Sequence, residues 1–109
     1  MKLWLDDVRE PWRYGKLGWT WVKTAAEAIE LLKTGKVEEA SLDHDLAPEH
    51  YPWSGVPLDQ VLGTGYDVAL FLEANPEFYP PGGCKVHSMN PVGKARMEVA
   101  LLRAKKGVK

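Results

Sequence analysis

Hydrophobic residues in this chain occur in four short runs, each with the length and composition typical of a buried strand. The runs are residues 2–6, 19–22, 37–42 and 84–88. Three other segments place apolar residues every three or four positions, which is typical of amphipathic helices. These segments are residues 25–34, 64–75 and 91–106. Because strands that alternate with helices are joined by right-handed crossovers, the pattern predicts an α/β fold around a parallel sheet.

The expected helix boundaries carry capping residues. Thr24 and Thr64 each stand three residues before an acidic side chain, as in a capping box. Asn90 and Pro91 suit the N-cap and the first position of the last helix. These signals support the three predicted helices and their starting points.

Two connections lack a regular period. Residues 8–18 contain Pro11, Gly15 and Gly18, so the first crossover is expected to be a loop with at most a turn or two of helix. Residues 47–63 contain three prolines and two glycines. A structureless connection of that length in a compact domain is usually either functional or mobile.

Size and composition narrow the class of protein. A chain of 109 residues with 45% hydrophobic and 27% charged residues fits one globular domain, residues 1–109. No apolar run approaches the roughly 18 residues that span a bilayer, and no signal-peptide pattern opens the chain. Cys84 is the only cysteine, which excludes an intrachain disulfide. A cytoplasmic location is expected by elimination. The net charge of −1 argues against coating of nucleic acid through many phosphate contacts.

Polar groups end or directly follow three of the four strand-like runs. They are Asp6 and Asp7, then Asp43, His44 and Asp45, and finally His87 and Ser88. The carboxyl ends of parallel strands lie along one edge of a sheet, where such folds bind ligands. Crowded carboxylates repel one another, so either some of them are protonated or a cation lies among them, and a cation is expected. Carboxylate oxygens favour Mg²⁺ or Mn²⁺, with Asp6, Asp7 and Asp43 as the expected ligands.

The start of the last helix offers a second set of polar groups. His87 and Ser88 precede Asn90, and the N-terminus of a helix attracts phosphate. His87 titrates near neutral pH and is suited to moving a proton. Gly93 allows close approach of a ligand to the backbone, and Lys94 is the nearest flexible cation. The alternative is that His87 and Ser88 only complete the helix cap.

Two further residues admit two interpretations each. Arg9 has a planar guanidinium that suits two phosphate oxygens, but it could equally pair with the acidic residues beside it. His44 stands between two acids, either as a catalytic group or as a structural one. The tryptophans of the first two runs are expected to be core residues only. They are Trp4, Trp19 and Trp21.

The polar strand ends resemble those of receiver domains of response regulators. In that resemblance Asp6 and Asp7 match the cation-binding pair, Asp43 the phosphoryl acceptor and Ser88 the phosphate-contacting hydroxyl. Two features depart from it. The first crossover is poor in helix signals, and no fifth strand follows to present the lysine that pairs with the acyl phosphate.

A closer resemblance covers nearly the whole chain except residues 47–63. Four motifs are similar to those of the cyclic-phosphate processing receiver domain family: residues 5–9 (LDDVR), 41–46 (SLDHDL), 64–67 (TGYD) and 87–93 (HSMNPVG), with Met97 after the last. The resemblance implies a three-layer, flavodoxin-like sandwich. Its sheet would be short, mainly parallel and four-stranded, with the first crossover helix reduced to a loop.

This resemblance also implies a function. The family is suggested to process cyclic phosphate ends in RNA repair, so the expected partner is a 2′,3′-cyclic nucleotide or RNA terminus. The expected catalytic residues are Asp43, His87, His44 and Ser88, and the expected phosphate-binding residues are Arg9, Ser88, Asn90, Gly93 and Lys94. Two alternatives remain: a signalling module phosphorylated on Asp43, and a domain that binds cyclic phosphates without cleaving them.

Overall fold

The computed structural model of the protein describes residues 1–43, 64–88 and 91–108. Its strands are β1 (Lys2–Leu5), β2 (Thr20–Val22), β3 (Glu39–Leu42) and β4 (Cys84–Val86). Its helices are α1 (Ala25–Lys33), α3 (Gly65–Ala74) and α4 (Pro91–Gly107), with two short 3₁₀ turns, η1 (Pro11–Tyr14) and η4 (Pro76–Phe78). Each strand and α-helix lies within or close to a segment expected from the sequence. η1 falls in the first crossover, where at most a turn or two of helix was expected, and η4 was not expected. None of the described helices is long and apolar enough to cross a membrane.

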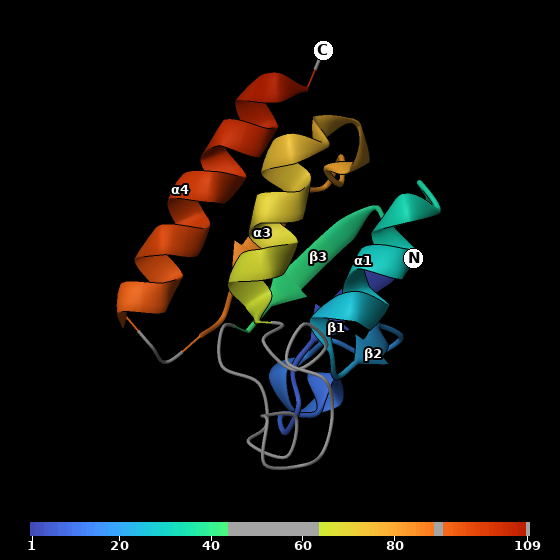
Figure 1. The fold of residues 1–109 in the computed structure, drawn as a ribbon. Coiled ribbons are helices and arrows are strands. Elements are labelled where there is room, and N and C mark those ends of the chain that lie inside the picture. Colours follow the sequence, from blue (N-terminus) through green and yellow to red (C-terminus); the bar gives the residue numbers. More distant parts are fainter. Residues whose placement is uncertain (44–63, 89–90, 109) are drawn as a thin grey trace, which may run out of the picture.

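The four strands form one parallel sheet in the order β2-β1-β3-β4 (Figure 1). β1 and β3 occupy the centre, and their residues Leu3, Leu5 and Leu42 are all fully buried. The prediction of a parallel α/β fold of the receiver type is confirmed.

The three α-helices cover one face of this sheet (Figure 1). Side chains alternate between the two faces of a strand, so Leu3 and Leu5 lie on the same face as Ala40 and Leu42, which pair with them. All four belong to the cluster of buried side chains that the helices complete. α4 packs closely against α3 and contributes its buried stripe, which includes Met97.

An irregular segment, residues 7–19, packs against the opposite face. Trp4 points to this side. Its ring stacks on Tyr14, with ring centroids 5.7 Å apart, and makes an edge-to-face contact with Trp19, with ring centroids 6.3 Å apart. Trp12 and Trp21 make a second edge-to-face pair at 5.6 Å. The first crossover is therefore a loop with a single 3₁₀ turn, as expected, and its aromatic side chains form the third layer. Trp4 is a core residue, but Trp19 and Trp21 are only partly buried.

Capping residues fix the helices in the predicted way. Thr24 Oγ1 accepts a hydrogen bond from the N–H of Glu27 at 3.1 Å. Thr64 and Asp67 form a complete capping box at the start of α3. This places Gly65 against the end of β3, where a Cβ would collide with the carbonyl oxygen of Asp43. Only glycine allows the start of α3 to lie so close to Asp43.

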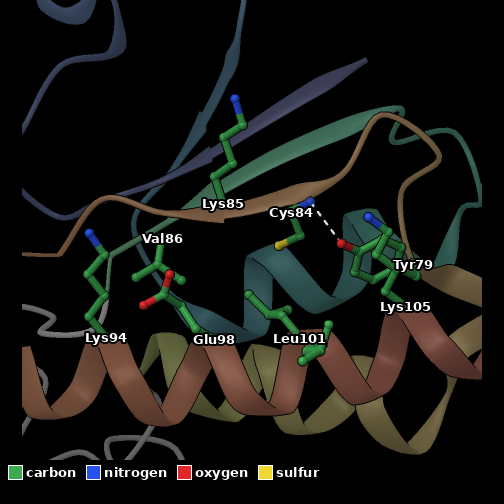
Figure 2. A pocket seen from close by; sticks show the side chains of 9 residues that line it. Tyr79, Cys84, Lys85, Val86, Lys94, Glu98, Leu101 and Lys105 are labelled. Atoms are coloured by element: carbon green, nitrogen blue, oxygen red, sulfur yellow. Dashed lines mark hydrogen bonds between the residues drawn. The ribbon is translucent and has the colours of Figure 1, made fainter.

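An open groove of about 370 Å³ runs between β4 and α4 at the edge of the sheet (Figure 2). Val86 and Leu101 form part of its floor, and Lys94 and Lys105 stand along its α4 side. The outer side of β4 therefore borders a partly apolar channel with cationic side chains.

Candidate active site at the carboxyl ends of the strands

Three polar residues directly follow three neighbouring strands: Asp6 after β1, Asp43 after β3 and His87 after β4. The last strand residues, Leu5, Leu42 and Val86, are paired with one another in register. The ladder continues one step further, because the N–H of Asp43 donates to Leu5 O at 2.9 Å and that of His87 donates to Leu42 O at 3.0 Å. The three polar residues therefore stand at the same level of the sheet.

Asp6 is held rigidly within the fold. Its side chain is only 1% exposed, and Oδ1 accepts hydrogen bonds from the backbone N–H groups of Val8 at 2.9 Å and Arg9 at 2.8 Å. Its carbonyl oxygen accepts from the indole N–H of Trp21 at 2.7 Å. With Oδ1 fixed in this way, Oδ2 is the oxygen that faces the neighbouring strands.

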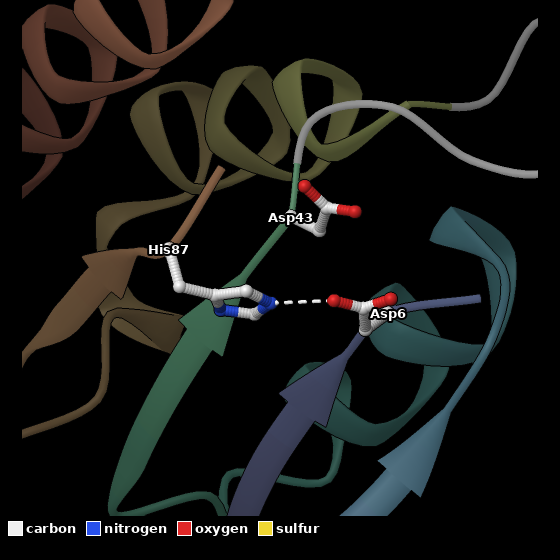
Figure 3. A group of neighbouring side chains, drawn as sticks. All are labelled: Asp6, Asp43 and His87. Atoms are coloured by element: carbon white, nitrogen blue, oxygen red, sulfur yellow. Dashed lines mark hydrogen bonds and ion pairs between the residues drawn. The ribbon is translucent and has the colours of Figure 1, made fainter. Parts of the chain in front are cut away.

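The side chains of Asp6, Asp43 and His87 converge, and we call them the Asp6–Asp43–His87 cluster (Figure 3). One potential ligand atom from each lies within 4.8 Å of the other two. Asp6 and Asp43 are buried and His87 is partly buried. The geometry suits a small cation, because each of the three groups offers an oxygen or nitrogen donor.

His87 is held at both ring nitrogens and on one ring face. Nε2 lies 3.0 Å from Oδ2 of Asp6, and Nδ1 lies 2.7 Å from the hydroxyl of Ser41. The ring stacks on Trp4, with centroids 4.0 Å apart and planes 4° apart. Burial lowers the pKa of His87, and the hydrogen bond to Asp6 offsets this only in part. The imidazole is therefore mainly neutral at neutral pH.

Trp4 and Ser41 are functional neighbours that the sequence did not reveal. They are paired across β1 and β3, and Ser41 is paired with Lys85, two residues before His87. All three side chains thus share a face of the sheet with His87. Ser41, His87 and Asp6 form a chain of contacts like that of a hydrolase triad, but Ser41 is only 6% exposed and is buried in the sheet face. It is placed to position the ring and not to attack a substrate.

Arg9 faces both acids of the cluster. Its Nη1 lies 3.7 Å from Oδ2 of Asp6 and 3.9 Å from Oδ1 of Asp43. The carbonyl oxygen of Arg9 accepts a hydrogen bond from the indole of Trp4 at 2.8 Å, which fixes the loop that carries it. The side chain remains 31% exposed. Pairing with the acids, one of its two interpretations, is therefore present, and the guanidinium also reaches the solvent side of the cluster.

The other predicted site residues are less closely grouped. Asp7 is half-buried and is not a member of the cluster. Ser88 and Gly93 are buried at either side of the start of α4, and Lys94 lines the groove between β4 and α4. His44 and Asn90 lie outside the described residues. Metal, catalytic and phosphate-binding roles for these residues stay predictions.

Comparison with known proteins identifies the family to which this chain belongs. A family model described as "Cyclic-phosphate processing Receiver domain" matches residues 1–103. The comparisons with curated proteins and with solved structures give no match. A match over almost all of the chain agrees with the parallel sheet and the polar strand ends described above. The chain therefore belongs to the family of cyclic-phosphate processing receiver domains.

Proposed function

We propose that the protein is a metal-dependent phosphoesterase that opens cyclic phosphates at 2′,3′-cyclic nucleotides or RNA ends. The observation that carries the proposal is the convergence of two buried carboxylates and an imidazole within 4.8 Å at the edge of a parallel sheet. The family description adds the chemical class of the substrate. A buried site with paired acids beside an arginine matches what hydrolysis of a phosphodiester requires.

The donor set fits a divalent cation. Asp6 and Asp43 bring two carboxylates into a site that is almost closed to solvent, and Arg9 is the cation that the structure places within ion-pair distance of both. Two buried carboxylates this close repel each other unless positive charge lies between them, so Mg²⁺ or Mn²⁺ would be favoured there. Asp7, the residue after Asp6 in the chain, is proposed as a further ligand of the cation. A bound cation would polarise a phosphoryl oxygen and offset charge that develops during displacement.

Arg9 is proposed to bind the phosphate. If a divalent cation offsets the charge of the two carboxylates, the partly exposed guanidinium of Arg9 is available to bind two phosphate oxygens in a bidentate contact. The hydroxyl of Ser88 and the start of α4 at Gly93 are proposed to hold the remaining oxygens, with Asn90 and Lys94. Arg9 would then serve both charge compensation and substrate orientation.

His87 is proposed to move the proton. In the metal-free protein the carboxylate of Asp6 can only accept, so Nε2–H donates to Oδ2 of Asp6 and Nδ1 accepts from the hydroxyl of Ser41. If Oδ2 of Asp6 turned toward a bound cation, the ring could take the other tautomer, with Nδ1–H donating to Ser41, and Nε2 would be free to accept a proton from water. Water adds to phosphorus, one phosphorus–oxygen bond to the ribose breaks, and Nε2 returns a proton to the leaving oxygen. The product is a phosphomonoester with a free hydroxyl. Asp6 beside Nε2 stabilises the imidazolium formed between the two transfers. His44 is kept as a second candidate for proton transfer.

The test is turnover of 2′,3′-cyclic AMP in the presence of Mg²⁺ or Mn²⁺, followed by ³¹P NMR. Asp43→Asn and His87→Ala should each lower the rate at least 100-fold, and EDTA should abolish it. Glu77→Gln, at an exposed carboxylate on η4, is the matched control and should leave the rate unchanged. Turnover that is equal in all four proteins would refute the assignment. Thermal stabilisation by the nucleotide without product would assign a binding domain instead.

A further inference from the structure

The groove between β4 and α4 combines an exposed strand edge with an apolar floor. β4 is the last strand of the described sheet on this side. Val86 and Leu101 lie in the floor, and Leu102, which is 53% exposed, extends the apolar surface outward along α4. Covering an exposed leucine beside an open strand edge lowers the free energy, because apolar surface leaves water.

The backbone of β4 presents hydrogen-bonding groups to this groove. Gly83 O and His87 N–H both bond to β3, and the direction of backbone groups alternates along a parallel strand. Cys84 and Val86 therefore direct their N–H and C=O groups outward. The N–H of Cys84 donates to the hydroxyl of Tyr79 at 3.4 Å, whereas none of the described residues hydrogen-bonds to the outward groups of Val86. Such an edge is a template for one more strand.

Charge selects the kind of strand that fits. Three lysines and one glutamate line the groove. Lys94 and Lys105 stand near its two ends on α4, with Glu98 between them, and the Lys85 side chain extends from β4 away from α4 (Figure 2). This excess of positive charge favours an acidic partner and disfavours a basic one.

We propose that this groove binds an extended, acidic and apolar segment of a partner polypeptide, which adds to the sheet beside β4. Alternate side chains of that segment would pack on Val86, Leu101 and Leu102, since side chains of a strand alternate between its faces. Acidic side chains at its two ends would pair with Lys94 and Lys105. The backbone contacts supply affinity, and the lysines supply selectivity.

The dimensions of the groove agree with this occupant. Lys94 and Lys105 are eleven residues apart on α4, which corresponds to about 16 Å along a helix. An extended segment of five residues spans about 17 Å. Acidic residues four positions apart, which share one face of the segment, would therefore reach both lysines.

A second copy of this chain is the less favourable occupant. Antiparallel pairing of β4 with its own copy around Lys85 would place the two Lys85 side chains directly opposite each other. Like charges at such positions destabilise a strand pair. A lysine on an edge strand commonly prevents this kind of self-association.

The experiment is selection of a phage-displayed library of random heptapeptides on the immobilised protein, residues 1–109. Enriched peptides should carry two acidic residues four positions apart, with apolar residues at alternate positions between them. Lys105→Glu should weaken binding of these peptides at least tenfold. Lys106→Glu is the matched control, because Lys106 lies on the same turn of α4 but does not line the groove, and it should bind as the wild type does.

A second variant tests the backbone pairing. Val86→Pro removes one outward N–H and leaves the hydrogen bonds to β3 in place, so it should also weaken binding while the melting curve stays cooperative. Equal binding by Lys105→Glu and the wild type, enrichment of peptides without acidic residues, or no enrichment would overturn the proposal. So would a dimer in sedimentation that Leu102→Asp dissociates, because the groove would then hold a second copy. None of these outcomes depends on turnover of a cyclic phosphate.

Discussion

The imidazole of His87 lies flat against the indole of Trp4, with ring centroids 4.0 Å apart and planes 4° apart. Trp4 is 2% exposed and is itself stacked on Tyr14, so one face of the histidine is shielded from water. Burial of this kind disfavours the charged imidazolium and lowers the pKa of His87. A tryptophan on β1 thus helps to set the protonation state of a residue 83 positions later in the chain.

Replacement of Trp4 should therefore change the titration of His87. In Trp4→Leu the imidazole gains contact with water, and its pKa should rise toward the ordinary value. Trp4→Phe keeps an aromatic face and should leave the pKa lowered. NMR titration of the His87 ring protons, assigned with His87→Gln, measures both. An identical pKa in the wild type and Trp4→Leu would show that the stacking does not set it.

Ser41 should stabilise the neutral ring of His87. Ser41→Ala leaves the partly buried Nδ1 without its 2.7 Å partner, and an unsatisfied buried acceptor costs about 1–3 kcal/mol of folding free energy. Urea unfolding of the metal-free protein measures this loss. Ser41→Thr retains the hydroxyl and should recover most of it. Equal free energies of unfolding for Ser41→Ala and the wild type would contradict the role given to this hydrogen bond.

The lowered pKa of His87 predicts a pH dependence of stability in the metal-free protein. A histidine whose folded pKa lies below its unfolded value binds a proton more readily when the chain unfolds. Its contribution to stability is therefore present above about pH 6.5, the unfolded value, and is lost as the pH falls through the lower folded pKa. Urea unfolding between pH 5 and 8 should show this loss in the wild type and a smaller one in His87→Gln. The same slope in both proteins would assign the effect to other groups.

Gly65 should be required for the position of Asp43. A Cβ at residue 65 meets the backbone carbonyl of Asp43 and the end of the Met97 side chain, so Gly65→Ala must push α3 away from the end of β3. We expect a loss of about 1–3 kcal/mol in the free energy of unfolding, as for other overpacked sites. Ala69→Gly exchanges the same two residue types at another buried position of α3. It is the control for the difference in helix propensity between glycine and alanine. Wild-type stability in Gly65→Ala would show that the contact relaxes without cost.

Much of the fold follows from local patterns in the sequence. The apolar runs at residues 2–6 and 37–42 predicted two strands, and the polar residues at their ends predicted that Asp6 and Asp43 would meet if these strands were neighbours. That prediction needs only the strand order and the rule that parallel strands end at one edge. The capping signals at Thr24 and Thr64 likewise predicted the starts of α1 and α3, because they depend on neighbours a few residues away.

The surroundings of His87 could not be predicted in the same way. Its contacts with Trp4 and Ser41 depend on the register between β1, β3 and β4, which brings together residues 46 and 83 positions apart in the chain. No local pattern fixes that register. A usable signal did exist: residues two positions before Asp6 and Asp43 must share their face of the sheet. Those residues are Trp4 and Ser41.

The most direct test of the account is a titration of the metal-free protein with Mn²⁺, followed by electron paramagnetic resonance of the free ion. Since Asp6 and Asp43 are proposed to hold one cation between them, the wild type should bind a single Mn²⁺, and Asp43→Asn should bind it at least tenfold more weakly. Glu77→Gln should match the wild type. Equal Mn²⁺ affinity in Asp43→Asn and the wild type, or no binding to either, would contradict a metal site at the carboxyl ends of these strands.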